Sequence, residues 1–395
     1  MTEFVLRGGA VADVEGTRTA DVAVANGEIL AVGDADAVDD AVGDTDTDPT
    51  ELDVSGRVIA PGLIDAHVHL MMDGRADVAT ATADSDYTAS YRAANNLQTA
   101  LHAGVTTVRD LGSRGTLAID AGTAVANGVL DGPRVVACGR NVIMTGGHGN
   151  WFGREADGPA EVRKAAREQL KAGADVLKCM ATGGVLTEGA VTGAAELTPA
   201  ELEAFTDAAA PTDTPTAAHA HGTVGIKNAV EAGITSIEHG TFMDQAAADL
   251  MAAHDTYWVP TASALHGIVE HGVEAGIPAD AVTKAEAAAD AFDDAWNHAL
   301  DAGVRIAMGT DAGTPFNDFA DIPTELALMV EYGLSPAAAL EAATVNAADL
   351  LGLDDVGRVE PGYRADLVVL DADPNVDVDA WRTPEAVFVD GDRAV

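Results

Sequence analysis

The chain has 395 residues, of which 47% are hydrophobic, so it can bury the core of one large α/β domain with an appendage or of two to three ordinary domains. It carries 64 acidic residues against 22 Lys and Arg, which gives a formal net charge of −42 at pH 7. A surface of this charge repels phosphate backbones and anionic lipids, so it excludes nucleic acid and acidic membranes as predicted partners.

The small number of lysines also predicts a protein adapted to concentrated salt, in which the repulsion between surface carboxylates is screened. The lysines are Lys164, Lys171, Lys178, Lys227 and Lys284. On this hypothesis, dialysis into dilute buffer unfolds the protein, and full stability in dilute buffer contradicts it. The alternative is an ordinary acidic cytosolic protein.

Cysteine usage and the amino terminus both favour the cytoplasm. Cys138 and Cys179 lie in apolar runs and are expected to be buried thiols, not a disulfide. Residues 1–7 lack a basic segment followed by a long apolar one, and the chain has no window of about 18 apolar residues. We therefore predict a soluble, cytoplasmic protein.

The two ends of the chain have the composition of short β-strands. Residues 4–7, 21–24 and 28–32 are apolar runs separated by turn sequences such as Asn26-Gly27, and residues 365–370 and 386–389 repeat this style. The acidic run 34–48 is expected to be a solvated loop. Neither end has enough strands for a stable sheet of its own. We therefore predict one small β-sandwich domain, built from residues 1–57 and 355–395.

Between these ends, β-rich runs alternate with alanine-rich helical segments. The predicted strands are residues 58–69, 104–110, 134–143, 175–182, 215–221, 236–239, 257–261 and 304–311. The predicted helices are residues 87–103, 159–172, 198–210, 224–232 and 279–302, several of which end in Ala-Gly. Thr198-Pro199 and Ser335-Pro336 have the pattern of a helix N-cap.

Eight strand–helix units in series predict a (β/α)₈ TIM barrel over residues 58–354, within the α/β class. A doubly wound open sheet is the alternative. It is disfavoured because no Gly-x-Gly-x-x-Gly sequence follows the first strand.

His67-Val68-His69 closes the first strand and raises the question of a metal. Residues two apart in a strand point to the same side, so the two imidazoles stand together in apolar surroundings. A divalent metal ion is one suitable partner, because neutral imidazole is a good ligand for zinc and similar ions. The alternative is two histidines hydrogen-bonded to the backbone.

Ionisable or metal-binding side chains also close other strands of the predicted barrel, at the end where barrel enzymes place their chemistry. They are Lys178, His219, His221, His239 and Asp311. Arg109 and Asp110, at the end of the second strand, are candidates for contact with a substrate. Together these residues are hard to explain by packing alone.

Lys178 lies between apolar residues, where a charged ammonium group is costly. Burial lowers the pKa of a lysine, and its neutral amine can add carbon dioxide to give a carbamate that bridges two divalent ions. The alternative is an ion pair with a nearby acid such as Asp175 or Glu238.

These residues, in this order, resemble the amidohydrolase superfamily. More narrowly, they resemble its metal-dependent prolidase-like branch, which contains Xaa-Pro and other aminoacyl dipeptidases and ochratoxin-hydrolysing amidases. The resemblance covers nearly the whole chain. The matching stretches are residues 58–65, 103–110, 146–149, 219–222, 237–240 and 361–368.

The resemblance implies a site with two divalent metal ions, for which zinc, manganese and cobalt suit the ligands and zinc is the first choice. It implies that His67, His69 and Asp311 bind one ion, that His219 and His239 bind the other, and that carboxylated Lys178 bridges both. The choice between His219 and His221 stays open. His148 and His221 are expected to contact the substrate.

The implied function is hydrolysis of the C–N bond of a small-molecule amide, a dipeptide or an N-acyl amino acid. A hydroxide that bridges the metals attacks the carbonyl, and Asp311 carries the proton to the leaving amine. One alternative is a one-metal enzyme that resembles imidazolonepropionase or a deaminase, which Lys178 disfavours; Gly222 further disfavours a deaminase, which tends to have Glu there. Another is an inactive binding scaffold. A homo-oligomer is left open.

Overall fold

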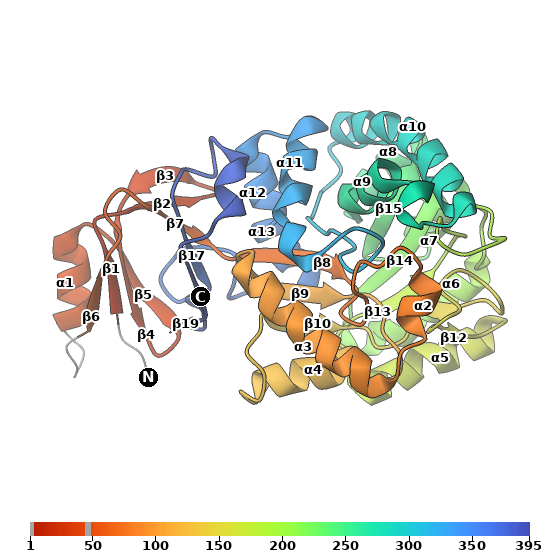
Figure 1. The fold of residues 1–395 in the computed structure, drawn as a ribbon, viewed down its shortest axis with the longest axis horizontal. Helices are drawn as coiled ribbons and strands as arrows, with labels where there is room; N and C mark the ends of the chain where they lie inside the picture. Colours follow the sequence, from red (N-terminus) through yellow and green to blue (C-terminus); the bar gives the residue numbers. More distant parts are fainter. Residues whose placement is uncertain (1–3, 44–48) are drawn as a thin grey trace.

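The structure is a computed structural model that describes residues 4–43 and 49–395. Residues 1–3 and 44–48, which belong to the predicted small domain and the acidic run, lie outside the described residues. Figure 1 shows an α/β body with a β-rich part beside it, and strands from both ends of the chain meet in the β-rich part.

The β-rich part contains two sheets. The first has the order β5 (Glu28–Gly33), β4 (Asp21–Ala25), β1 (Phe4–Arg7) and β6 (Thr50–Asp53). The second has the order β19 (Asp392–Arg393), β18 (Ala386–Val389), β17 (Leu367–Leu370), β7 (Val58–Pro61), β2 (Ala10–Asp13) and β3 (Gly16–Thr19).

Apolar side chains from both sheets form one buried cluster, in which the rings of Phe4 and Phe388 stack at 4.9 Å. The two ends of the chain therefore do pack together, as expected. The division into residues 1–57 plus 355–395 and residues 58–354 remains a prediction.

Two predicted elements of this part differ from the structure. The run 58–69 is not one strand: β7 joins the end sheet, and the next strand, β8 (Leu63–Val68), joins the body. Both halves are buried, so the sequence shows one apolar run. The chain passes between the sheets at Gly62, where a Cβ atom would lie 2.2 Å from the Thr106 side chain.

The acidic run 34–48 is also not simply a loop, because residues Ala35–Gly43 form helix α1. The Asp34 side chain accepts a hydrogen bond from the Ala37 amide, as an N-cap residue does, and Val38 is buried against the first sheet. The many aspartates of this segment favoured the prediction of a loop, although its apolar residues have helical spacing.

The α/β body contains two parallel sheets. One has the order β10 (Arg134–Ala137), β9 (Val105–Asp110) and β8. The other has the order β12 (Arg154–Glu155), β11 (Val142–Ile143), β13 (Leu177–Met180), β14 (Thr216–Gly222), β15 (Ser236–Phe242) and β16 (Tyr257–Val259).

Backbone hydrogen bonds join the two sheets on both sides. On one side the Asp175 amide donates to the Ala137 carbonyl at 2.9 Å. On the other, the segment 304–312 bonds to both β16 and β8: the Trp258 amide donates to Arg305 at 2.8 Å, and the Asp311 amide donates to His67 at 2.7 Å. The arrangement is TIM-barrel-like.

The last predicted strand, residues 304–311, has only isolated bridges to its neighbours, so the described residues do not form one continuous eight-stranded barrel. Gly309 accounts for part of this irregularity. A Cβ atom there would lie 2.5 Å from Val259 and 2.8 Å from His67, so the segment runs unusually close to both neighbours.

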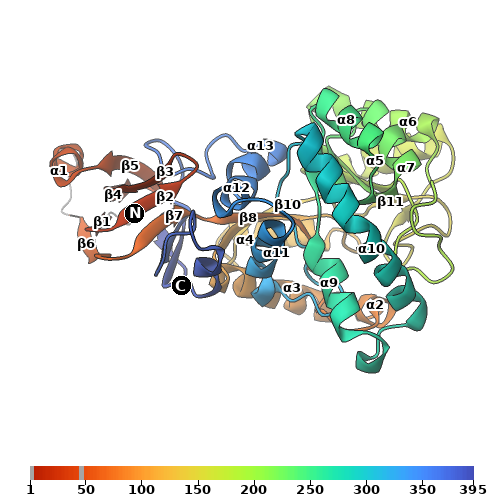
Figure 2. The same cartoon turned by 90° about the horizontal axis from the view of Figure 1, so that it is seen from above.

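Helices cover the outside of the parallel strands, as Figures 1 and 2 show. They are α2 (Val78–Thr82), α3 (Asp86–His102), α4 (Leu117–Ala126), α5 (Pro159–Ala172), α6 (Pro199–Ala209), α7 (Thr223–Glu231), α8 (Gln245–Ala253), α9 (Ala262–His271), α10 (Ala279–Ala302), α11 (Pro323–Glu331), α12 (Pro336–Ala342) and α13 (Val345–Leu351). Short 3-10 turns lie at Ala210–Thr212, Val273–Ala275, Phe319–Asp321 and Val378–Arg382.

The predicted caps are confirmed. Thr198 and Ser335 accept hydrogen bonds from the first turns of α6 and α12, and Gly173 and Gly303 end α5 and α10 in the left-handed conformation.

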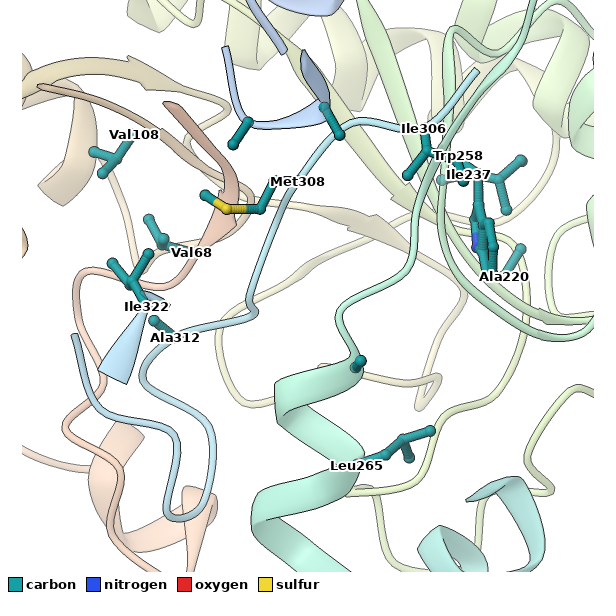
Figure 3. Packing of buried hydrophobic residues seen from close by; sticks show 14 of the residues in the cluster. Val68, Val108, Ala220, Ile237, Trp258, Leu265, Ile306, Met308, Ala312 and Ile322 are labelled. Carbon is teal, nitrogen blue, oxygen red and sulfur yellow. The ribbon is translucent and has the colours of Figure 1, made fainter. Parts of the chain in front are cut away.

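The core of the body lies between the strands and these helices. Figure 3 shows part of it, where Trp258, Ile237 and Ile306 pack together. Cys138 and Cys179 are buried free thiols, as predicted. Among residues 4–43 and 49–395, no helix combines the length and apolar character needed to span a bilayer.

Candidate metal centre

All eight predicted site residues line one cavity. They are His67, His69, His148, Lys178, His219, His221, His239 and Asp311. Each lies in a body strand or in the segment that follows one, and each is buried. Parallel strands thus bring together residues that are up to 244 positions apart in the chain.

The first group of potential metal ligands lies around Asp311. Ligand atoms of His67, His239 and Asp311 all lie within 4.8 Å of one another. Asp311 Oδ1 is 3.5 Å from His67 Nε2 and 3.2 Å from His69 Nε2. The imidazole of His67 in β8, that of His69 just after β8, and the Asp311 carboxylate therefore face the same point.

The second group contains His219, His221 and His239, whose ligand atoms also lie within 4.8 Å of one another. The ring of His239 is 4.5 Å from that of His219 and 4.9 Å from that of His221. The two candidates from β14 are thus both close to His239, and the choice of His219 as a ligand remains a prediction.

Hydrogen bonds to Nδ1 fix the orientation of four of these rings. His67 Nδ1 contacts the Glu238 carboxylate at 2.9 Å, and His69 Nδ1 donates to the Gly112 carbonyl at 2.9 Å. His221 and His239 contact the hydroxyls of Thr241 and Thr261 at 2.7 Å. With Nδ1 occupied, Nε2 is left for a metal, which is the usual arrangement of histidine ligands.

Three buried polar atoms of the cavity have no hydrogen-bond partner among the described residues: Lys178 Nζ, His219 Nε2 and Asp311 Oδ1. Buried polar groups are rarely left in this state, because each lost hydrogen bond is costly. Nitrogen and carboxylate donors that converge without partners are the donor set of a divalent metal site. The residues therefore fit the divalent metal ions that the fold family uses.

Lys178 is 2% exposed and forms neither of the ion pairs that the sequence left open. The Asp175 carboxylate accepts a hydrogen bond from the Ala137 amide instead, and Glu238 pairs with Arg109. Burial lowers the pKa of Lys178, and the nearby Glu238 carboxylate offsets only part of this decrease. The structure thus favours the neutral amine that carbamate formation requires.

Burial also lowers the pKa of every cavity histidine except His69, so these rings are neutral. Burial alone would lower the pKa of His69 too, but the Asp311 carboxylate outweighs it and raises that pKa. Burial lowers the pKa of His67 and of His221 to about 4, and that of His148 to about 3. Neutral imidazole is the form that binds metals. Burial alone would raise the pKa of Asp311, but His67, His69 and Lys178 outweigh it and lower that pKa, so the carboxylate stays ionised.

A second set of buried polar groups supports the site. Glu238 is fully buried and is bound by His67, by the Arg109 guanidinium at 3.0 Å and by the Ser236 hydroxyl at 2.5 Å. Burial alone would raise the pKa of Glu238, but Arg109, Lys178 and His67 lower it to about 2. This charged group therefore holds the His67 ring in place.

The suggestion that Arg109 and Asp110 contact the substrate is wrong. Neither lines the cavity. Arg109 also donates to the Ala66 carbonyl at 2.5 Å, and the Asp110 carboxylate accepts hydrogen bonds from the amides of Leu70 and Gly112. Arg109 thus holds β8 and Glu238, and Asp110 holds the backbone that follows β8 and β9.

Backbone conformation also marks the site. His239, Thr261 and Asp311 have positive φ angles of 69°, 53° and 61°, which residues with a Cβ atom rarely adopt. Such strain persists where the surroundings hold a side chain in a required position. The three residues belong to the same cavity.

The sequence did not indicate the supporting residues Thr187, Thr241 and Thr261 as functional. Each contacts a histidine that lies 20 to 39 positions away in the chain. No local motif marks a threonine for this role. Glu238 directly precedes His239, and this position is the one feature of the sequence that could have indicated a supporting role. The sequence suggested it only as an ion-pair partner of Lys178.

Comparison with known proteins gives one consistent result. Residues 58–394 match the model of the amidohydrolase family. The chain is 32% identical to ochratoxinase of Aspergillus niger over 360 residues, which cover 84% of this chain and 73% of the relative. It is 28% identical to imidazolonepropionase of Streptomyces griseus over 373 residues, or 87% of this chain and 86% of that one.

A solved structure of a Xaa-Pro dipeptidase with bound methionine in the active site superposes with a TM-score of 0.91. It is 30% identical, and the match covers 99% of both chains. The resemblance drawn from the sequence is thereby confirmed. The chain belongs to the amidohydrolase family and is a hydrolase that acts on amide bonds.

Proposed function

We propose that this protein is a binuclear metal-dependent amidohydrolase that cleaves a dipeptide or an N-acyl amino acid. The observation that carries the proposal is the set of buried atoms without hydrogen-bond partners, Lys178 Nζ above all, in a cavity lined by six imidazole groups and one carboxylate. A one-metal site needs no buried lysine.

The proposed ligands follow from the two groups of side chains. His67, His69 and Asp311 would hold one ion, and His219 and His239 would hold the other. Lys178 would join the two sites after its neutral amine has added carbon dioxide and lost a proton. Zinc is our first choice, with manganese and cobalt as alternatives. When bound, such ions polarise a carbonyl group and bring the pKa of a water molecule close to neutrality.

Asp311 is the proposed proton carrier. Asp311 lines the cavity and can hold the attacking water there. The carboxylate accepts a proton as the water oxygen bonds to the carbonyl carbon, and it passes that proton to the amine nitrogen as the C–N bond breaks. The low pKa of Asp311 keeps it in the ionised form that this step requires.

The walls of the cavity support an apolar substrate. They include Met72, Val78, Trp151, Phe152, Val185, Leu186, Leu265 and Ile268. Among the described residues that line the cavity, Lys178 is the only lysine or arginine. We therefore propose that the neutral imidazoles of His148 and His221, instead of a cationic side chain, contact the polar groups of the substrate.

The similarity to imidazolonepropionase keeps a one-metal cyclic amide hydrolase as a second candidate. A deaminase is less compatible with the structure. The glutamate expected three residues after His219 would replace Gly222, and a Cβ atom there would lie 2.1 Å from the Gly193 carbonyl oxygen.

The test combines metal analysis with a hydrolysis screen. Purified protein is loaded with zinc, manganese or cobalt and its metal content per chain is measured. It is then offered Xaa-Pro and other dipeptides, N-acyl amino acids with apolar side chains, and a cyclic amide. Each acid is paired with its carboxamide, so that the screen also reports whether a free carboxylate is required.

The expected result is about two ions per chain and release of the free amine from the apolar substrates. One ion per chain with cleavage of the cyclic amide alone would favour the second candidate. A protein that binds no divalent ion would contradict both and leave the scaffold alternative.

A further inference from the structure

His148 lies farther from the end of its body strand than any other histidine of the cavity. It lies in the glycine-rich segment after β11, and its ring is 4.3 Å from that of His219 and 6.2 Å from that of Trp151. The question is which of its two nitrogens carries the proton, because this decides whether it donates to a substrate or accepts from one.

The loop between β13 and α6, residues 181–198, answers this question through Thr187. The Thr187 hydroxyl contacts His148 Nδ1 at 2.7 Å, and the Gly149 amide donates to the same oxygen at 3.3 Å. These are the two contacts of Thr187 Oγ1 among the described residues, and Thr187 is only 5% exposed.

The hydrogen bonds of this oxygen can be assigned by elimination. The Gly149 amide can only donate, so it cannot accept the hydroxyl proton of Thr187. If His148 Nδ1 also donated, the buried hydroxyl proton would have no acceptor, which is costly. The Thr187 hydroxyl therefore donates to His148 Nδ1, and the proton of the neutral ring lies on Nε2.

We propose that Thr187 is a positioning residue that holds His148 as an Nε2–H donor in the cavity. The metal-ligand candidate His239 is held in the opposite way. The Thr261 hydroxyl donates to the Pro260 carbonyl at 2.7 Å, so it accepts from His239 Nδ1 and leaves Nε2 bare. A threonine hydroxyl bound to Nδ1 thus makes Nε2 of His148 a hydrogen-bond donor, and it leaves Nε2 of His239 free to bind a metal.

Several other contacts fix the loop on His148. The Glu196 carboxylate accepts from the His148 amide at 3.0 and 3.1 Å. Lys284 of α10 donates to the Thr187 carbonyl at 2.9 Å. Gly184 lies against the ring, since a Cβ atom there would be 2.4 Å from His148 Nε2. The Thr187 contact is therefore part of a rigid arrangement, not a chance approach of two loops.

The role in catalysis rests on the proposed function. An Nε2–H group held in this way can donate to the carbonyl or carboxylate oxygen of an amide substrate. Thr187 does not line the cavity and acts on the substrate only through His148.

The direct test is nitrogen-15 NMR of the histidine-labelled, zinc-loaded protein, with His148→Gln used to assign the signals. Bare and protonated ring nitrogens have well separated chemical shifts. We expect a bare Nδ1 and a protonated Nε2 for His148 in the wild type and in Thr187→Ser. Thr187→Val should lose the fixed tautomer. Thr123→Val makes the same change on the exposed face of α4, away from His148, and should leave its signals unchanged.

Kinetics with an apolar N-acyl amino acid give the second readout. Thr187→Val should lower kcat/KM about tenfold, as is typical when a partner that orients a catalytic group is removed, and Thr187→Ser should restore it. The NMR spectrum tests the tautomer even if no substrate is found, so failure of the proposed function would not be mistaken for failure of this inference.

A proton on His148 Nδ1 in the wild type would overturn the proposal. So would a Thr187→Val spectrum in which His148 keeps the wild-type tautomer. If Thr187→Val does not fold, the spectra of the wild type and Thr187→Ser still decide the tautomer, and Thr187→Ala provides the missing variant.

Discussion

Two sets of buried polar groups lie next to each other in this protein, and they differ in whether their hydrogen bonds are satisfied. In the set beneath the site, Glu238 has partners on every side: Arg109, Ser236 and His67. In the cavity, Lys178 Nζ and His219 Nε2 have no hydrogen-bond partner among the described residues. The first set is therefore satisfied within the chain, and the second is not.

The two sets should therefore differ in what they contribute to the stability of the metal-free protein. Buried charges that are fully paired fix the geometry around them, whereas unpaired ones reduce stability until something binds them. His67 connects the two sets, with Nδ1 on Glu238 and Nε2 toward Asp311. Substitutions in the two sets should therefore have opposite effects on the metal-free protein.

The largest effect is expected from Asp311→Asn, which removes the proposed proton acceptor. Turnover should fall by at least about 1,000-fold, within the range that general acid–base groups contribute, because the amide cannot take the proton of the attacking water. The measurement is kcat on the best substrate of the screen.

Circular dichroism and the metal content per chain serve as controls for this variant. If Asp311→Asn keeps its fold and more than a tenth of the wild-type rate, Asp311 is not the proton carrier.

Glu238→Gln should be the most damaging change in the satisfied set. It leaves the Arg109 guanidinium buried without its counter-charge, for which a loss of about 3 kcal/mol in the free energy of unfolding is typical. Urea unfolding of the metal-free protein measures it. The matched control is Glu231→Gln on the exposed surface of α7, which should change stability by less than about 0.5 kcal/mol.

Lys178→Met should act in the opposite direction. It replaces a buried amine that has no partner with an apolar side chain of similar length, so the metal-free variant should be about 1 kcal/mol more stable than the metal-free wild type. The same variant should bind fewer than two ions per chain. A metal-free Lys178→Met protein that is less stable than the wild type would show that Lys178 already has a partner, contrary to the comparison above.

The sequence predicted which residues share one cavity better than it predicted where the strands begin and end. His67, His69, Lys178, His239 and Asp311 could be brought together in advance because parallel strands place their C-terminal residues at one rim. No such periodic rule exists for the threonines that orient the rings, because each belongs to a different loop or strand.

The boundaries of the strands were the least predictable feature. One apolar run serves both β7 and β8, and the last barrel segment makes backbone hydrogen bonds to both neighbours without forming a regular strand. Both features depend on close contacts of glycines with distant residues, at Gly62 with Thr106 and at Gly309 with Val259. Such contacts leave no trace in the local pattern of the sequence.

The smallest effect is expected when the salt concentration is varied. This experiment distinguishes the contribution of the buried ion pair to stability from that of the surface charges. Lowering the salt concentration should reduce the stability of wild type and Glu238→Gln alike, because the net charge of −42 is then less screened. The difference between them should stay constant within about 0.5 kcal/mol, since a fully buried ion pair is little affected by mobile ions. Urea unfolding of both proteins in dilute and concentrated KCl measures this. A difference that grows in dilute buffer would mean that the Arg109–Glu238 pair is coupled to the surface charges, and that the two sets of buried groups cannot be treated separately from the acidic exterior.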